Sequence, residues 1–164
     1  MSGATRRRLL VAVLVAQVAV LLGIAALHGV RVAEGTRVQL AVVPVDPLDL
    51  ARGAYVDLRY ELEELELPDG VRDGDDVYVE LERPTADDDV WTAVATAASP
   101  DDFDDPDAFI RLAVEDDAIG TGQISTYYAS SDEAKRLESD LADGGVAEVV
   151  LSGDGEPLLD VVRG

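Results

Sequence analysis

The sequence predicts an N-terminal transmembrane helix followed by a mostly β (α+β) domain of about seven to eight antiparallel strands, with one helix near the C-terminus. Three observations lead to this fold class. An apolar run occupies residues 9–30, apolar and polar residues alternate in several segments after residue 35, and one amphipathic segment begins at residue 130. An apolar run of about 20 residues is long enough to cross a bilayer, and alternation with a period of two is typical of half-buried strands.

The apolar run is long and almost uninterrupted. Its 22 residues contain one polar side chain, Gln17, before His28. As a helix they extend about 33 Å, against roughly 30 Å of hydrocarbon. Secretory signal peptides have shorter apolar regions that end at a small-x-small site, and no good Ala-x-Ala sequence follows this run. We therefore predict an uncleaved signal-anchor helix, with a cleaved signal peptide as the alternative.

Charged residues predict how the chain is oriented. Three consecutive arginines, Arg6, Arg7 and Arg8, precede the apolar run, and basic residues favour the cytoplasmic side of a membrane. We expect residues 1–8 to form a cytoplasmic basic flank and residues 31–164 to form a domain outside the cytoplasm. The protein would then be a single-pass protein of the cell membrane, with membrane lipid as the partner of its helix.

The part of the chain after residue 30 is strongly acidic. The whole chain has a net charge of −21, and removal of the three N-terminal arginines leaves 10 basic residues (13 − 3) against 34 acidic ones, or −24. Such a surface repels the phosphate backbone, so we expect no nucleic-acid partner. The absence of cysteine from the sequence excludes disulfides, thiolate metal sites and thiol catalysis.

The clearest predicted strand covers residues 54–62. Its alternation places Val56, Leu58 and Tyr60 on one face and Tyr55 on the other. Turn sequences rich in glycine, proline and aspartate separate further segments of this kind. Further strands are expected over residues 36–43, 77–82, 90–96, 108–114, 122–128, 146–151 and 157–162.

Two segments are predicted to be helical. In residues 130–144, Ser130 and Glu133 have the spacing of a capping box, and an apolar stripe with helical spacing follows them. A short turn is expected over residues 46–53, because Asp46 is placed to cap a helix whose first residue is a proline.

One part of the sequence resembles a known family. The segment VVPVDPLDLARGAYVDLRY, residues 42–60, is similar to the GDYXXLXY family, a group of bacterial and archaeal membrane-associated proteins of unknown function. Gly53, Tyr55, Leu58 and Tyr60 match the pattern that gives the family its name, whereas Ala54 stands in place of the aspartate. Residues 120–138, GTGQISTYYASSDEAKRLE, also look like a later segment of the family. The resemblance implies membrane tethering and supplies no chemistry.

Residue types exclude several enzyme classes. His28, the single histidine, lies at the end of the apolar run, so the acidic domain cannot hold a Ser-His-Asp triad or a histidine-rich zinc site. A Ser–Lys peptidase would need a serine soon after the apolar run, but the first one is Ser99, and Lys135, the single lysine, lies on a predicted surface helix. The acidic loop 100–107 lacks the spacing of an EF-hand. We predict no catalytic residues, no metal ligands and no cofactor.

The remaining candidates form a contact patch. Tyrosine and arginine are enriched in protein–protein hot spots, and the predicted binding residues are Arg52, Gly53, Tyr55, Tyr60, Tyr127 and Tyr128. Core packing is the alternative role for Tyr60, and one of the two adjacent tyrosines should be exposed. We therefore expect a membrane-tethered extracytoplasmic accessory or interaction domain with a membrane-protein partner. A carboxylate-dependent envelope enzyme and a calcium or other cation-binding module are the alternatives.

Overall fold

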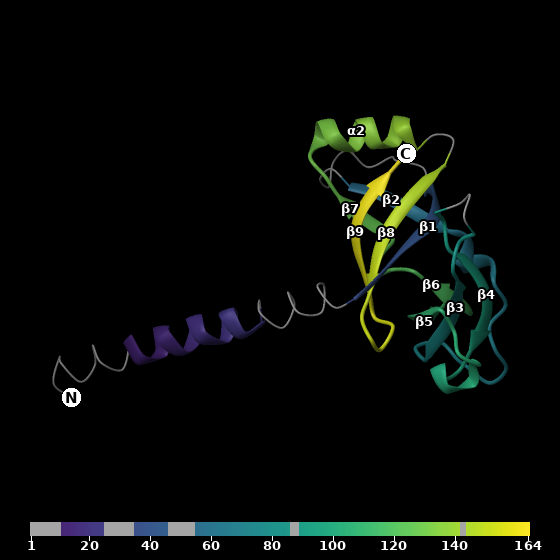
Figure 1. Cartoon of the computed structure of the whole chain (residues 1–164). Coiled ribbons are helices and arrows are strands. Elements are labelled where there is room, and N and C mark those ends of the chain that lie inside the picture. Colours follow the sequence, from purple (N-terminus) through teal and green to yellow (C-terminus); the bar gives the residue numbers. More distant parts are fainter. Residues whose placement is uncertain (1–10, 25–34, 46–54, 86–88, 142–143) are drawn as a thin grey trace. The chain divides into compact units, whose positions relative to one another are not determined.

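The computed structural model describes residues 11–24, 35–45, 55–85, 89–141 and 144–164. The chain divides into two compact units, Met1–Gly35 and Thr36–Gly164. We refer to the second as the acidic unit. It contains all the strands of the described structure (Figure 1).

The described part of the first unit is a helix over residues 11–24, whose leucine, isoleucine and valine side chains are exposed. No helix in the described residues is long and apolar enough to cross a membrane. The 14 helical residues extend only about 21 Å, less than the roughly 30 Å of hydrocarbon in a bilayer. The predicted fold class is therefore wrong in its transmembrane helix over residues 9–30, which the described structure does not contain. Residues 1–8, 9–10 and 25–30 lie outside the described residues.

Nine strands are described in the acidic unit. They are β1 (Thr36–Val45), β2 (Tyr55–Tyr60), β3 (Asp76–Glu82), β4 (Thr92–Ala97), β5 (Ala108–Glu115), β6 (Ala118–Gly120), β7 (Thr126–Tyr128), β8 (Gly145–Leu151) and β9 (Pro157–Arg163). Two 3-10 turns, η1 (Glu61–Glu64) and η2 (Pro100–Asp102), and the helix α2 (Ser131–Asp140) accompany them.

The strands form two antiparallel sheets. Sheet A has the order β7-β2-β1-β8-β9, and sheet B has the order β4-β3-β5-β6. In sheet A, β1 pairs with β8 from Thr36 to Val42 but with β2 only from Val42 to Val45. The N-terminal half of β1 therefore has a free edge on its β2 side, and there the Trp91 N–H, just before β4, donates a hydrogen bond of 2.8 Å to the Gln39 carbonyl. This bond links the two sheets.

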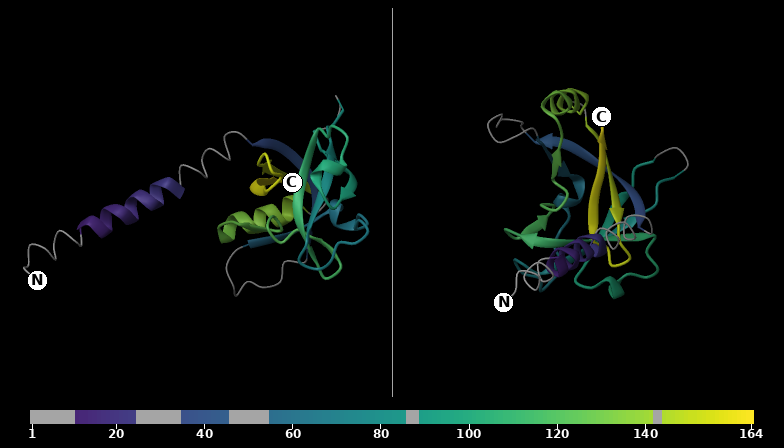
Figure 2. Two further views of the ribbon diagram at one scale, coloured as in Figure 1. Left: turned by 90° about the horizontal axis from the view of Figure 1, so that it is seen from below. Right: turned by 90° about the vertical axis from the view of Figure 1, so that its left-hand side faces the viewer.

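One hydrophobic core joins the sheets and α2. Inward-facing apolar side chains of β1, β2 and β8 supply most of this core on the side of sheet A, and fully buried valine, leucine and isoleucine side chains each contribute about 1.5–3 kcal/mol. Sheet B supplies buried residues of β3 and β5, and α2 supplies Ala134, Leu137 and Leu141. In Figure 1 and the right-hand view of Figure 2, α2 lies near one end of sheet A and sheet B lies toward the other.

The predicted fold class is also wrong in its number of strands. The expected strand over 122–128 is a strand only at β7, because the N–H groups of Ile124 and Ser125 both donate to the Thr121 carbonyl at 2.8 Å and form a turn. The short β6 was missed, since three residues are too few to show alternation. The helix α2 lies within the segment 130–144 that was predicted to be helical, and β8 and β9 follow it. The predicted turn over 46–53 lies outside the described residues.

The turn between β8 and β9 docks on sheet B through Gly155. Its carbonyl accepts a 2.8 Å hydrogen bond from the Arg111 N–H, and the Arg111 guanidinium lies 3.8 Å from the Asp154 carboxylate. Gly155 has φ +79°, and a Cβ there would lie 2.7 Å from the Phe109 ring and 3.1 Å from the Arg111 nitrogen. Backbone conformation and close packing therefore both require glycine at this position.

We expect Gly155→Ala to lower the free energy of unfolding of the full-length protein by about 1–3 kcal/mol, because alanine resists the positive φ and crowds Phe109. Urea denaturation followed by fluorescence of Trp91, the single tryptophan, measures this change. Gly153→Ala is the control, since a Cβ at Gly153 has no atom within 4 Å. Equal losses in the two variants would contradict the role given to the docked turn.

Candidate functional site

Sheet A has an outer face that is turned away from the core. Cross-strand pairing brings the residues of this face into rows such as Ala41, Val146 and Arg163. The outer face includes Arg37, Ala41, Val43, Tyr55, Asp57, Arg59, Thr126, Tyr128, Val146, Glu148, Leu158 and Arg163. Three arginines against two carboxylates make this face different from the acidic unit as a whole.

The structure divides the predicted contact patch between two faces. Tyr55 and Tyr128 are cross-strand partners on the outer face, with ring centroids 6.5 Å apart and planes inclined by 54°. Tyr128 is 80% exposed, whereas Tyr60 is 1% exposed and belongs to the core. Tyr127 is half-buried and packs against that core. Arg52 and Gly53, like Ala54, lie outside the described residues.

Tyr60 has a structural role. Its hydroxyl donates a hydrogen bond of 2.8 Å to the Ile124 carbonyl, which fixes the turn before β7. Its N–H donates to the Glu63 Oε1 atom at 3.0 Å, and the same oxygen accepts from the Thr121 hydroxyl at 2.7 Å. Burial, and to a lesser extent the nearby Glu63 carboxylate, raises the pKa of the Tyr60 hydroxyl above its usual value of 10.0. These bonds hold η1 in place at the end of β2.

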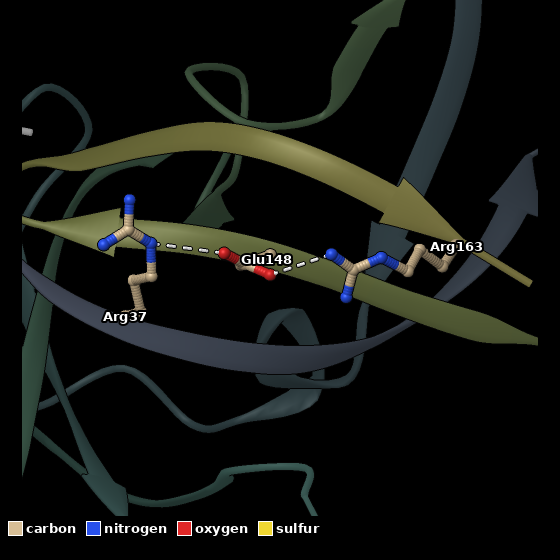
Figure 3. Close-up of polar contacts among 3 residues, drawn as sticks. All are labelled: Arg37, Glu148 and Arg163. Atoms are coloured by element: carbon tan, nitrogen blue, oxygen red, sulfur yellow. Dashed lines mark hydrogen bonds and ion pairs between the residues drawn. The ribbon is translucent and has the colours of Figure 1, made fainter.

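Two of the three arginines on the outer face share one carboxylate. The Arg37 Nε atom lies 3.3 Å from Glu148 Oε1, and the Arg163 Nη2 atom lies 3.2 Å from Glu148 Oε2. Figure 3 shows Glu148 between the two arginines, each on a different neighbouring strand. Ion pairs with exposed arginines contribute at most about 1 kcal/mol each. Their main consequence is that the Glu148 carboxylate partly offsets the positive charge of Arg37 and Arg163.

Arg59 differs from these two arginines. It is exposed on β2, and within the described structure no carboxylate lies at ion-pair distance from it. The neighbouring Asp57 carboxylate instead accepts a hydrogen bond of 3.2 Å from the Thr126 hydroxyl, which joins β2 to β7. Arg59 therefore presents a charged group that the described residues leave available to another molecule.

A groove of about 790 Å³ begins at Arg59. Ala41, Val43 and Val146 of the outer face line it together with Leu65 and with Ala93 of β4, and Glu61 and Glu64 of η1 add negative charge beside Arg59. Val43 is 50% exposed there. The described lining contains no histidine, cysteine or serine, and it combines aliphatic surface with the charged residues Arg59, Glu61 and Glu64.

The acidic side chains do not form a metal site in the described structure. No group of three or more aspartate, glutamate, histidine or cysteine residues is placed there to hold a metal ion. The loop with the most aspartates contains η2, where the Ser99 hydroxyl accepts a hydrogen bond of 3.3 Å from the Asp101 N–H. This part of the structure gives the calcium alternative no supporting geometry.

The acidic unit is thus a two-sheet antiparallel β structure whose distinguishing surface is a sheet face that bears aromatic, aliphatic and arginine side chains. The chain belongs to the GDYXXLXY family: the model of the GDYXXLXY protein matches residues 17–162. No curated protein and no solved structure matches the chain.

The spacing of the family motif has a direct structural meaning. Leu58 and Tyr60, two residues apart, both enter the core, whereas Tyr55, at an odd spacing from Leu58, lies on the outer face. Arg59 was not among the predicted contact residues, although it lies within the motif, because alternation shows which face a residue occupies but not whether it has a partner. Val43 and Val146 were not predicted either, because each adjoins core residues in the sequence and has the side chain of a core residue.

We expect Tyr60→Phe to lower the free energy of unfolding by about 1 kcal/mol at neutral pH, because the Ile124 carbonyl loses its hydroxyl donor. The pH dependence gives a sharper result. Since the folded state raises the pKa of Tyr60 above the unfolded value of 10.0, the folded state holds this proton more tightly, and stability falls as pH rises above that value.

Urea titrations of both proteins between pH 7 and pH 11 measure this effect. We expect the loss of stability above pH 10 to be smaller in Tyr60→Phe than in the wild type, and an equally steep loss in both would contradict the assignment.

Proposed function

We propose that this protein is a non-enzymatic interaction module whose acidic unit binds another membrane or envelope protein through the outer face of sheet A. The observation that supports this most strongly is the composition of that face. A unit with a net charge of −24 presents there the exposed Tyr128, the exposed Val43 and three arginines. Tyrosine and arginine are enriched among the residues that dominate binding energy at protein interfaces.

The rigidity of the face supports the same proposal. Tyr55 and Tyr128 are held by strand pairing and by each other's rings, and Asp57 and Thr126 bond the same two strands. Side chains fixed on a sheet lose less conformational entropy on binding than side chains on a mobile loop. The Tyr55–Tyr128 pair is therefore suited to act as an anchor for a partner.

We also propose that the apolar N-terminal segment keeps the protein at the cell membrane, with the acidic unit outside the cytoplasm. The exposed apolar side chains of the helix over residues 11–24 support the attachment, since such a surface favours lipid over water. The three arginines before it support the orientation. Protease treatment of intact cells checks this: the acidic unit should be digested while a cytoplasmic control protein is not.

We expect Tyr128→Ala to reduce partner recovery by about tenfold or more, because it removes an exposed hot-spot side chain. Cross-linking in intact cells followed by affinity purification of the full-length protein measures recovery, with residues 1–35 on an inert domain as the background. Loss of the Tyr55–Tyr128 contact should cost only about 0.2–1 kcal/mol of stability.

Val94→Ala is the matched control for this experiment. Val94 is 44% exposed, lies on β4 of sheet B and is not among the residues that line the groove at Arg59. Its replacement should leave partner recovery unchanged. Recovery of no protein above background, or equal recovery with Tyr128→Ala and the wild type, would contradict the proposed function.

A further inference from the structure

We propose that the groove beside Arg59 binds a short extended segment of the partner protein. This segment would have an aliphatic side chain in its middle, a carboxylate that pairs with Arg59, and a lysine or arginine that faces Glu61 and Glu64. The inference rests on the proposed function and names the chemistry of its partner. Three observations support it: the lining of the groove, the order of the charges of Arg59, Glu61 and Glu64, and the net charge of the acidic unit.

The size and lining of the groove favour a segment of chain. Its volume of about 790 Å³ lies within the range of pockets that enclose small ligands, which leaves room for a few side chains of a bound segment. Ala41, Val43 and Val146 come from two adjacent strands, β1 and β8, and make a continuous apolar surface. An aliphatic side chain that covers Val43 removes apolar surface from water, which is the general source of affinity in such sites.

The order of the charges along one side of the groove specifies the occupant. Arg59, Glu61 and Glu64 follow one another from the end of β2 through η1, so a positive charge is followed by two negative ones. A segment that lies along this side matches it with a carboxylate first and a basic residue second. Exposed ion pairs contribute little affinity, but complementary charges fix orientation and exclude mismatched partners.

Several contacts hold this charged side in position before any partner binds. Glu63, between the two groove glutamates, bonds both the Tyr60 N–H and the Thr121 hydroxyl. The Tyr60 hydroxyl bonds the Ile124 carbonyl in the same region. Because η1 is tied to the core in this way, the spacing between Arg59 and the two glutamates is set in advance, which lowers the entropy cost of binding.

The net charge of the acidic unit decides between possible occupants. At −24 the unit attracts a basic residue over a distance of about a Debye length and repels a segment that is acidic throughout. A second copy of this chain has the same negative charge and is disfavoured as the occupant. Arg59 places one positive charge beside the groove within the otherwise negative electrostatic field of the acidic unit. It therefore selects a single carboxylate within a segment that is otherwise basic and apolar.

Selection of peptides from a random library on the full-length protein tests this proposal. We expect enriched peptides to contain an acidic residue, an aliphatic residue and a basic residue in a fixed order. Affinity of the best peptide for Arg59→Glu should be about tenfold weaker. Repeated selection on Arg59→Glu should replace the acidic residue by a basic one, and selection on Glu61→Lys with Glu64→Lys should replace the basic residue by an acidic one.

Arg72→Glu is the matched control, since Arg72 is an exposed arginine that does not line the groove. It makes the same change of charge and should leave the selected pattern and the affinity unaltered. Peptides without the pattern, or a pattern that Arg59→Glu leaves unchanged, would overturn the proposal. Self-association of the wild-type protein that Arg59→Glu abolishes would also overturn it, in favour of a second copy as the occupant.

The two proposals fail in different ways. If cross-linking recovers a partner that Tyr128→Ala loses but Arg59→Glu keeps, the interaction function stands and the groove segment is rejected. If no partner is recovered but the selected peptides depend on Arg59, the groove binds such segments while the cellular function assigned to the outer face fails.

Discussion

The structure depends on how the inner face of sheet A is covered. Strands β1 and β2 bury every second side chain, β8 buries Ala147 and then Val149 to Leu151, and neither sheet B nor α2 covers the inner face alone. The two together complete it, sheet B through β3 and β5 and α2 through three apolar side chains. The bond from Trp91 to β1 and the docking of Gly155 on β5 then fix sheet B against sheet A. With the inner face occupied in this way, the outer face of sheet A can vary its side chains without loss of core packing.

The family motif connects the core to that outer face. In the segment from Tyr55 to Tyr60, the residues with an even spacing from Tyr60 are buried, and those with an odd spacing are outside. Tyr60 then uses its hydroxyl and its N–H to hold the turn before β7 and the start of η1. This short strand therefore packs one set of side chains into the core and places Tyr55 and Arg59 on the outer face, so replacement of a buried side chain would lower stability and also disturb the positions of Tyr55 and Arg59.

Alternation in the sequence was enough to place most strands and the amphipathic segment, and it separated Tyr55 from Tyr60 correctly. It could not resolve β6, which is shorter than one full period of the pattern, or the turn at Thr121, which depends on hydrogen bonds between main-chain groups. Hydropathy alone predicted a membrane-spanning helix that the described residues do not contain. The groove at Arg59 could not be predicted from the sequence either. Its lining depends on the register between β1, β2 and β8, and this register arises from tertiary contacts.

If a partner covers the outer face of sheet A in the cell, side chains on that face are shielded from reagents, and the lack of cysteine in the sequence allows a direct measurement of this shielding. Val43→Cys places a thiol on this face, and Val94→Cys places one of similar exposure, 44% against 50%, on sheet B. Rates of labelling by a membrane-permeant maleimide are compared in intact cells and in purified protein. We predict that labelling of Val43→Cys is several-fold slower in cells, while Val94→Cys reacts equally fast in both. Equal rates for Val43→Cys in cells and in purified protein would contradict the account.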